Sequence, residues 1–159
     1  MEITNDVWHS ILWHRNELSW KFHAGQRVID QAYRNVTAKL FVANCSRRFG
    51  KTFWVVTECI RVAQSKPRAR VKVATAFLTD LEEFIVPAFE SVLDDCPDSI
   101  RPRWHESKKK FIFKNGSEIQ LIGLDRKPNA GRGNYCDLYV FDEAAYIKNV
   151  SYIYQDNKS

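Results

Sequence analysis

The sequence contains no apolar run that approaches the roughly 20 consecutive residues a membrane-spanning helix needs, so we expect no contact with a membrane. Its first residues do not join a basic stretch to an apolar core, so we expect no secretory signal. It has no internal repeat and no low-complexity tract, and nothing in it resembles a helix-turn-helix or a zinc finger. These absences argue against a membrane-spanning helix, a repeat protein and the common readers of specific DNA sequences.

Cysteines are few, and their spacing indicates no metal site. None of the four has a partner at the Cys-x-x-Cys spacing or a nearby histidine that would complete a zinc pattern. We therefore expect reduced thiols in a cytosolic protein at Cys45, Cys59, Cys96 and Cys136. The four histidines are scattered, and none is assigned to a metal or to catalysis.

What is present is the composition of a folded domain. Hydrophobic residues make up 45% of the 159 residues, which is enough for one substantial core. The 24 Lys and Arg residues outnumber the 19 Asp and Glu residues, which gives a net charge of +5. That excess fits a polyanionic partner, although ordinary soluble domains reach it too.

Apolar periodicity predicts helices that alternate with strands. We expect helices over residues 5–14, 22–33, 51–64 and from about 79 to 96, and strands over 39–44, 71–77, 109–113, 117–122 and 137–141. The Asn115-Gly116 pair between two alternating segments predicts a β-hairpin. This order of elements predicts an α/β fold whose mostly parallel sheet has helices on both faces, with the hairpin as an antiparallel addition.

Residues 45–52 read Cys-Ser-Arg-Arg-Phe-Gly-Lys-Thr, between a predicted strand and a predicted helix. A triphosphate site needs backbone N–H groups that point inward, a lysine that reaches the β/γ oxygens and a hydroxyl for Mg²⁺. Gly50 allows close approach of the backbone, Lys51 supplies the cation and Thr52 supplies the hydroxyl. Cys45 replaces the first glycine of the G-x-x-x-x-G-K-[S/T] pattern, so the prediction of a phosphate loop depends on its context.

Two arginines, Arg47 and Arg48, lie inside this loop, where an ordinary phosphate loop needs neither. We interpret Arg47 as an arginine finger in cis, whose guanidinium neutralises charge that develops on the γ-phosphate. The alternative for both side chains is exposure to solvent or pairing with an acid, and the role of Arg48 stays open.

The apolar run at residues 138–141 ends in two adjacent acids, Asp142 and Glu143. Asp142 is predicted to hold Mg²⁺, and Glu143 to orient and polarise the attacking water. Adjacent acids at a strand end are common on protein surfaces. The prediction of a nucleotide-hydrolysis site therefore depends on the phosphate loop about ninety residues earlier.

The residues 46–52, Ser-Arg-Arg-Phe-Gly-Lys-Thr, and 140–144, Val-Phe-Asp-Glu-Ala, resemble the Walker A and Walker B motifs of the ATPase domain of the phage large terminase subunit. This subunit is the DNA-packaging motor of tailed bacteriophages, and its loop lacks the first glycine and carries an early arginine, as at Arg47. The resemblance implies a P-loop NTPase fold of the RecA/ASCE type, with ATP and Mg²⁺ as cofactors. The loop residues that would contact the nucleotide, besides the three already named, are Ser46, Arg47, Arg48 and Phe49.

The resemblance also implies roles for residues outside the two motifs. Phe22-His-Ala-Gly-Gln26 looks like the family's adenine motif, so Gln26 would bond the adenine edge and Phe22 would pack nearby. The alternative for Gln26 is a glutamine on a helix surface. Arg132, between two glycines, is placed like an arginine that in some members reaches the neighbouring subunit's site. Its alternative is a solvated loop arginine.

The resemblance covers residues from about 22 to 146, so we expect an N-terminal helical segment over 1–21 and an ATPase domain over 22–159. Family ATPase domains continue with a strand that carries a coupling motif, and then with a nuclease domain. The residues after Glu143 show no acid cluster that could cleave DNA with two metals. We therefore expect a domain truncated at its C-terminal end and no nuclease activity from this chain.

For function, the resemblance implies an ATP-hydrolysing motor that drives viral DNA into a capsid. Its partners would be double-stranded DNA of any sequence, further copies of the chain in a ring, the portal and the small terminase subunit, in the cytoplasm of an infected bacterial host. Two alternatives stay open: a helicase- or translocase-like P-loop ATPase that uses the same residues, and a nucleotide-binding remnant without turnover.

Two basic clusters are candidates for contacts with DNA phosphates, and a solvated basic surface is the preferred interpretation of each. One comprises Lys66, Arg68, Arg70 and Lys72, and the other Lys108, Lys109, Lys110 and Lys114.

Overall fold

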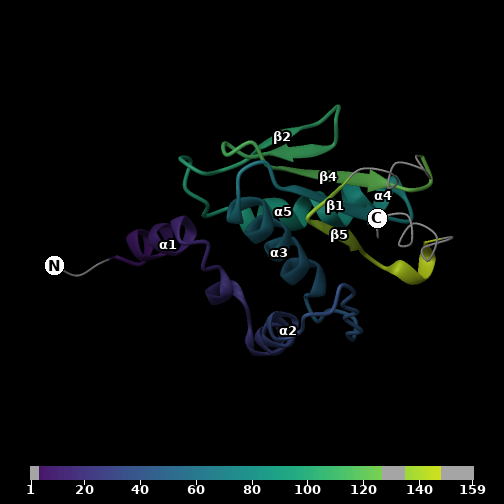
Figure 1. Ribbon diagram of the computed structural model, residues 1–159, viewed down its shortest axis with the longest axis horizontal. Coiled ribbons are helices and arrows are strands. Elements are labelled where there is room, and N and C mark those ends of the chain that lie inside the picture. The colour runs from purple at the N-terminus through teal and green to yellow at the C-terminus, as the bar shows by residue number, and fades with distance from the viewer. Residues whose placement is uncertain (1–3, 127–134, 148–159) are drawn as a thin grey trace.

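The computed structural model describes residues 4–126 and 135–147 (Figure 1). Its helices are α1 (Asn5–His14), α2 (Ala24–Asn35), α3 (Lys51–Ser65), α4 (Leu78–Asp80) and α5 (Val86–Leu93), with short helical turns η1 (Ser19–Lys21), η2 (Leu81–Ile85) and η3 (Ala144–Tyr146). Its strands are β1 (Arg70–Thr75), β2 (Arg103–His105), β3 (Lys110–Ile112), β4 (Glu118–Gly123) and β5 (Leu138–Phe141). No described helix is long and apolar enough to cross a bilayer.

The five strands form one sheet in the order β2-β3-β4-β1-β5. Strands β4 and β5 flank β1 and run parallel to it, whereas β3 and β2 continue the sheet in antiparallel pairing. The predicted hairpin is confirmed as β3 and β4. Its turn contains Gly116 at φ +83°, a left-handed conformation that costs glycine little. Asn115 supports the turn because its Oδ1 accepts the N–H of Ser117.

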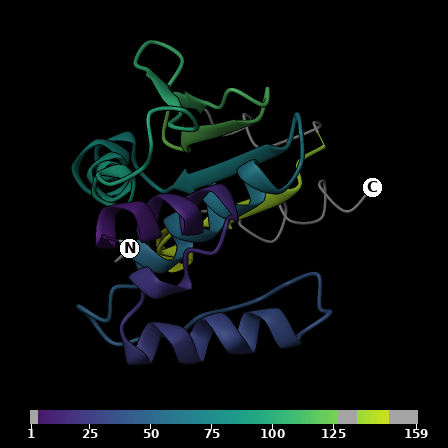
Figure 2. The ribbon, with the colours of Figure 1, turned by 90° about the vertical axis from the view of Figure 1, so that its left-hand side faces the viewer.

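The main core lies between one face of the sheet and the helices. The buried apolar side chains of β1, β4 and β5 that point to this face meet those of α3, η2 and α5, including Val73, Ile119, Val140, Ile60, Ile85 and Phe89. In Figure 1 and Figure 2, α3 lies between the sheet and α2, so α2 forms an outer layer. Burial on both sides explains why α3 is apolar over most of its length.

The opposite face of the sheet carries a smaller apolar cluster of Ala74, Ala76, Ile122, Leu124 and Ile147. Within residues 4–126 and 135–147, the helical segments that contribute to the main core, α3, η2 and α5, pack against the first face of the sheet. The α/β fold with a mostly parallel sheet and an added hairpin is therefore confirmed. Among the described residues, the cluster on the second face includes Ile147 directly after η3.

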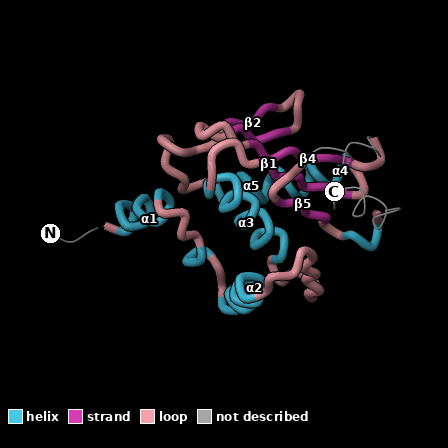
Figure 3. The backbone as a smooth tube through the Cα atoms, viewed as in Figure 1, coloured by secondary structure: helices cyan, strands magenta, loops and turns pink. Residues whose placement is uncertain are grey.

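One predicted strand, over residues 39–44, is wrong. Figure 3 draws the connection between α2 and α3 as loop throughout, and no backbone hydrogen bond joins these residues to a described strand. Leu40 and Val42 are 55% and 77% exposed, while the ring of Phe41 packs edge-on against Tyr33 of α2. The apolar run of a strand is present, but a strand also needs a neighbour for its backbone, and among the described residues this segment has none.

The helix after β1 also differs from expectation at its start. It was expected from about residue 79, but it begins at Leu78, whose N–H donates to the carboxylate of Asp125 at 2.8 Å. The π-helical turn η2 ends two residues before Pro87, which lies in the first turn of α5.

Candidate nucleotide-binding site

The two sequence motifs meet in space. Lys51, the first residue of α3, places its Nζ 3.5 Å from Oε1 of Glu143, which follows β5. The hydroxyl of Thr52 lies beside the carboxylate of Asp142 and acts to lower the pKa of that carboxyl. Segments 92 residues apart therefore form one polar site at the start of α3. Had they lain on opposite faces of the sheet, the interpretation as a nucleotide site would have failed.

The sheet positions the first of the two acids. The N–H of Asp142 donates to the carbonyl of Ala74 at 3.0 Å and extends the parallel β1–β5 pairing by one residue. This places its carboxylate at the carboxyl end of the parallel strands, the edge where open α/β sheets bind ligands. Burial raises the pKa of the Asp142 carboxyl, and the charge of Lys51 and the hydroxyl of Thr52 oppose that effect only in part.

The second acid stands in a strained conformation. Glu143 has φ +51°, a left-handed value that is uncommon for residues other than glycine. The side chain of Glu143 is 57% exposed, whereas Asp142 is partly buried, so the two adjacent carboxylates occupy different environments. Strain of this kind is often found at functional sites.

Two structural features explain why a glycine stands at position 50 of the predicted loop. Gly50 is the N-cap of α3 with φ +82°, and a Cβ there would lie 2.6 Å from Nε2 of Gln26. Its carbonyl accepts the N–H of Trp54 at 3.1 Å, which closes the first turn of α3. The N–H groups of that first turn have no partner within the helix, so they can bind an anion.

Gln26 is 4% exposed, and the chain's own backbone engages both ends of its amide. Its Nε2 donates to the carbonyl of Gly50 at 2.8 Å, and its Oε1 accepts the N–H of His23 at 3.1 Å. His23 in turn contacts the carbonyl of Phe49 through Nε2 at 2.9 Å. The sequence pointed to Gln26 but not to His23, because a histidine before a helix carries no recognisable motif.

The remaining predicted residues lie around this centre. Phe22 is 2% exposed, with the guanidinium of Arg61 5.0 Å from the centre of its ring. The carbonyl of Ser46 accepts the N–H of Phe49 within the loop. The arginines at 47 and 48 are exposed, and neither forms an ion pair with any other described residue. Arg132 lies outside the described residues.

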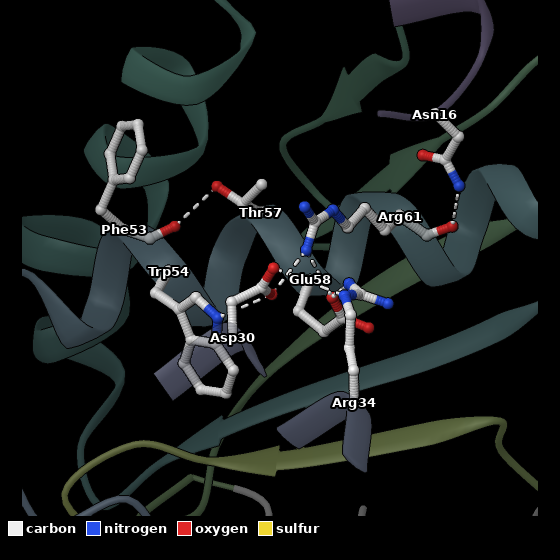
Figure 4. A network of polar contacts seen from close by, with 8 residues as sticks. All are labelled: Asn16, Asp30, Arg34, Phe53, Trp54, Thr57, Glu58 and Arg61. Atoms are coloured by element: carbon white, nitrogen blue, oxygen red, sulfur yellow. Dashed lines mark hydrogen bonds and ion pairs between the residues drawn. The ribbon is translucent and has the colours of Figure 1, made fainter. Parts of the chain in front are cut away.

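A buried polar network fastens α2 to α3 behind the loop. Figure 4 shows Asp30 and Arg34 of α2 facing Trp54, Glu58 and Arg61 of α3. Burial raises the pKa of the Asp30 carboxyl, but the hydrogen bond and charge of Arg61 outweigh it, so the net shift is downward. For Glu58, burial dominates and raises the pKa. The available sequence signal is that Gln26, Asp30 and Arg34 recur every four residues, on one face of α2.

Several lysines of the two basic clusters contact acids or carbonyl groups of the same chain. Lys109 pairs with Glu82 and Glu106, and Lys110 pairs with Glu118. Further contacts join Lys66 to Asp137, and Lys114 to the carbonyl of Asp98. These contacts favour a structural role for the named lysines over binding of DNA.

Neither a model of a known protein family nor a curated protein matches the sequence. Among solved structures, the large terminase from the thermophilic bacteriophage D6E matches with a TM-score of 0.67 at 15% identity, over 86% of this chain and 35% of that one. The large terminase ATPase domain of Thermus phage P74-26 matches with a TM-score of 0.65 at 18% identity, over 99% of this chain and 63% of that one. The chain thus spans less than two thirds of either, and its fold is that of the ATPase domain of phage large terminases.

Proposed function

We propose that this chain is an ATP-hydrolysing motor domain of a DNA-packaging terminase large subunit. The observation that carries the proposal is the meeting of Lys51 and Thr52 with the two acids after β5, within a fold like that of phage large terminases. In the proposed site, Lys51 holds the β/γ phosphates, and the free N–H groups at the start of α3 hold further phosphate oxygens.

The residues present fit a magnesium ion. The hydroxyl of Thr52 and the carboxylate of Asp142, which lie beside each other, offer the oxygen-only donor set that Mg²⁺ prefers. Burial disfavours the ionised form of the Asp142 carboxyl. A divalent cation bound to this carboxyl would stabilise the ionised form and so offset that effect. When bound, the ion would neutralise charge on the phosphate oxygens.

The exposed carboxylate of Glu143 orients and polarises the attacking water in this proposal. Its contact with Lys51 has to be exchanged when a triphosphate enters, because the lysine then turns to the phosphates. Arg47 reaches the γ-phosphate in cis and Arg132 acts across a subunit boundary. Gln26 bonds adenine after releasing one of its two backbone partners, with Phe22 packed nearby.

At the level of the assembly, we propose a homo-oligomeric ring that acts on double-stranded DNA together with the portal and the small terminase subunit. Its location would be the cytoplasm of an infected bacterial host. The moderate positive charge of the chain is compatible with contacts to DNA phosphates, which need no sequence preference.

Hydrolysis of Mg·ATP by the purified chain tests the proposal. We expect Glu143→Gln to retain nucleotide binding and to lower turnover by about 10²–10⁴-fold, the usual contribution of a general base. Lys51→Ala should lose binding itself. Glu83→Gln removes an exposed carboxylate from η2 and should match the wild type. Undiminished turnover in Glu143→Gln would contradict the assigned role of that residue.

A second candidate is nucleotide binding without turnover. It is favoured by the loop conformation of residues 39–44, which leaves the segment that leads into the phosphate loop outside the sheet. Bound nucleotide without hydrolysis, both alone and with DNA or portal present, would support this candidate. Stimulation by portal and double-stranded DNA would support the packaging motor, whereas stimulation by single-stranded nucleic acid would indicate a helicase-like ATPase.

A further inference from the structure

The first turn of α2 holds the end of the predicted phosphate loop through two consecutive carbonyl groups. His23 Nε2 contacts the carbonyl of Phe49 at 2.9 Å, and Gln26 Nε2 donates to the carbonyl of Gly50 at 2.8 Å. The rings of His23 and Phe49 also meet edge to face, with their centres 5.5 Å apart. A Cβ added at Gly25 would lie 2.9 Å from the Phe49 ring, so the two segments are closely packed.

The hydrogen bonds of the His23 ring assign its proton. Its Nδ1 accepts the N–H groups of Gly25 and Gln26, at 3.1 and 3.4 Å, as the N-cap of α2. An accepting nitrogen carries no proton, so the neutral ring bears its proton on Nε2. Nε2–H therefore donates to the carbonyl of Phe49, which can only accept. One nitrogen caps the helix, and the other holds the loop.

Holding a carbonyl also orients the next N–H. A trans peptide is planar, with its C=O and N–H pointing in opposite directions. The bond from His23 to the carbonyl of Phe49 therefore turns the N–H of Gly50 away from α2. The bond from Gln26 to the carbonyl of Gly50 does the same for the N–H of Lys51. These two amides stand at the start of α3, where an anion would bind.

The backbone alone does not select this orientation. Gly50 has φ +82°, and glycine adopts negative φ about as readily, so the peptide between Phe49 and Gly50 can rotate at little cost. The side-chain bond from His23 is what favours the observed direction. At the following peptide, the N–H of Trp54 also bonds the carbonyl of Gly50, so that peptide has a second support.

We propose that His23 is a positioning residue for phosphate binding: its Nε2–H fixes the Phe49–Gly50 peptide so that the N–H of Gly50 is available to a phosphate oxygen. The proposal rests on the proposed function, because it requires a nucleotide phosphate at the start of α3. His23 does not itself touch the phosphates. It acts through the peptide whose carbonyl it holds.

The two nitrogens of the ring can be separated by substitution. Asparagine places an acceptor near the position of Nδ1 and is a good N-cap, but it does not reach the carbonyl of Phe49. Glutamine places a donor near the position of Nε2 but is not a favoured N-cap. His23→Asn therefore keeps the cap and loses the hold on the loop, and His23→Gln does the reverse.

The test measures the affinity of the full chain for Mg·AMP-PNP by calorimetry, together with thermal unfolding. We expect His23→Asn to bind about threefold to tenfold more weakly than the wild type, the value of one hydrogen bond, with little change in Tm. We expect His23→Gln to restore most of the affinity and to lower Tm by about 2–4 °C, because the cap is lost.

Each other outcome has a distinct meaning. Wild-type affinity in His23→Asn would overturn the inference and leave the proposed function standing. So would a loss of affinity in His23→Gln at least as large as in His23→Asn, because affinity would then follow stability. Failure of the wild-type chain to bind Mg·AMP-PNP would overturn the proposed function and, with it, the role of His23.

Discussion

At the scale of single residues, two residues of the candidate site adopt conformations or environments that lower the stability of the folded chain. Glu143 adopts a left-handed backbone, and the carboxyl of Asp142 is desolvated more than its neighbours compensate. Both features are costs that a purely structural strand end would not need. They are understandable if a bound triphosphate and cation supply the missing charge, because function and stability commonly trade against each other at such sites.

Asp142→Asn should raise the stability of the free chain. Burial raises the pKa of Asp142 above its ordinary value of 3.8, so the folded state disfavours the ionised form. Wild-type stability is therefore greatest below the unfolded pKa and falls as the pH rises through the folded pKa. We expect the Tm of Asp142→Asn to exceed that of the wild type at pH 7, by a margin that shrinks towards pH 4.

The control for this prediction is Asp98→Asn, which removes the same charge from a side chain that is 99% exposed and should show no such dependence on pH. Asp142→Asn should also lose the stabilisation that Mg·AMP-PNP gives the wild type. A lower Tm for Asp142→Asn across this pH range would show that Lys51 and Thr52 outweigh the desolvation of the carboxyl.

At the scale of elements, α2 is joined to α3 by charges as well as by apolar contacts. Arg61 donates to both Asp30 and Glu58, and all three side chains are more than nine-tenths buried. Removal of the arginine leaves two buried carboxylates without their central cation. We expect Arg61→Met to cost about 3–5 kcal/mol in the free energy of unfolding, measured by urea denaturation.

Arg34→Ala is the matched comparison, because Arg34 belongs to the same network but its side chain is 48% exposed. Its removal should cost about 1 kcal/mol or less, as for other solvent-screened ion pairs. Equal losses in the two variants would contradict a network centred on Arg61. Since α2 also carries His23 and Gln26, Arg61→Met should in addition weaken binding of Mg·AMP-PNP.

The sequence predicted the elements whose signals are local. The helix over 51–64, the Asn115-Gly116 hairpin and the strand before Asp142 all appear within a few residues of the expected places. Their periodicity, turn residues and termination signals need no knowledge of partners. The convergence of Lys51 with Glu143 is only partly explained by the rule that parallel strands bring their carboxyl ends to one edge of the sheet, because β5 leads into Glu143 but a loop leads into Lys51.

The parts that could not be predicted depend on partners distant in the chain. Residues 39–44 contain the short apolar run of a buried strand, but pairing requires a neighbour that the segment itself does not encode. Asp30 lies on a polar face of α2 that would ordinarily indicate solvent, and only the fold brings Arg61 to it. The role of His23 depends on the approach of Phe49, which is likewise a consequence of tertiary structure.

At the scale of the whole molecule, the centre of the sheet is expected to resist local unfolding more strongly than the segment that leads into the candidate site. Strand β1 has parallel neighbours on both sides, and its side chains at 71 and 73 lie in the main core. The segment at 39–44 has two large apolar side chains exposed and no backbone bond to the sheet. The site is thus built where a rigid strand end meets a weakly held connection, as expected of elements that respond to ligands.

Amide hydrogen exchange of the free chain should therefore be slow in β1 and fast over residues 39–44, because only global unfolding opens β1. The same contrast is expected for substitutions. Val42→Thr should change the free energy of unfolding by less than about 0.5 kcal/mol, because Val42 is exposed. Val73→Thr buries a hydroxyl in the core and should cost about 1–3 kcal/mol. Slow exchange at 39–44, with a large cost for Val42→Thr, would mean that this segment joins β5 as a sixth strand in solution.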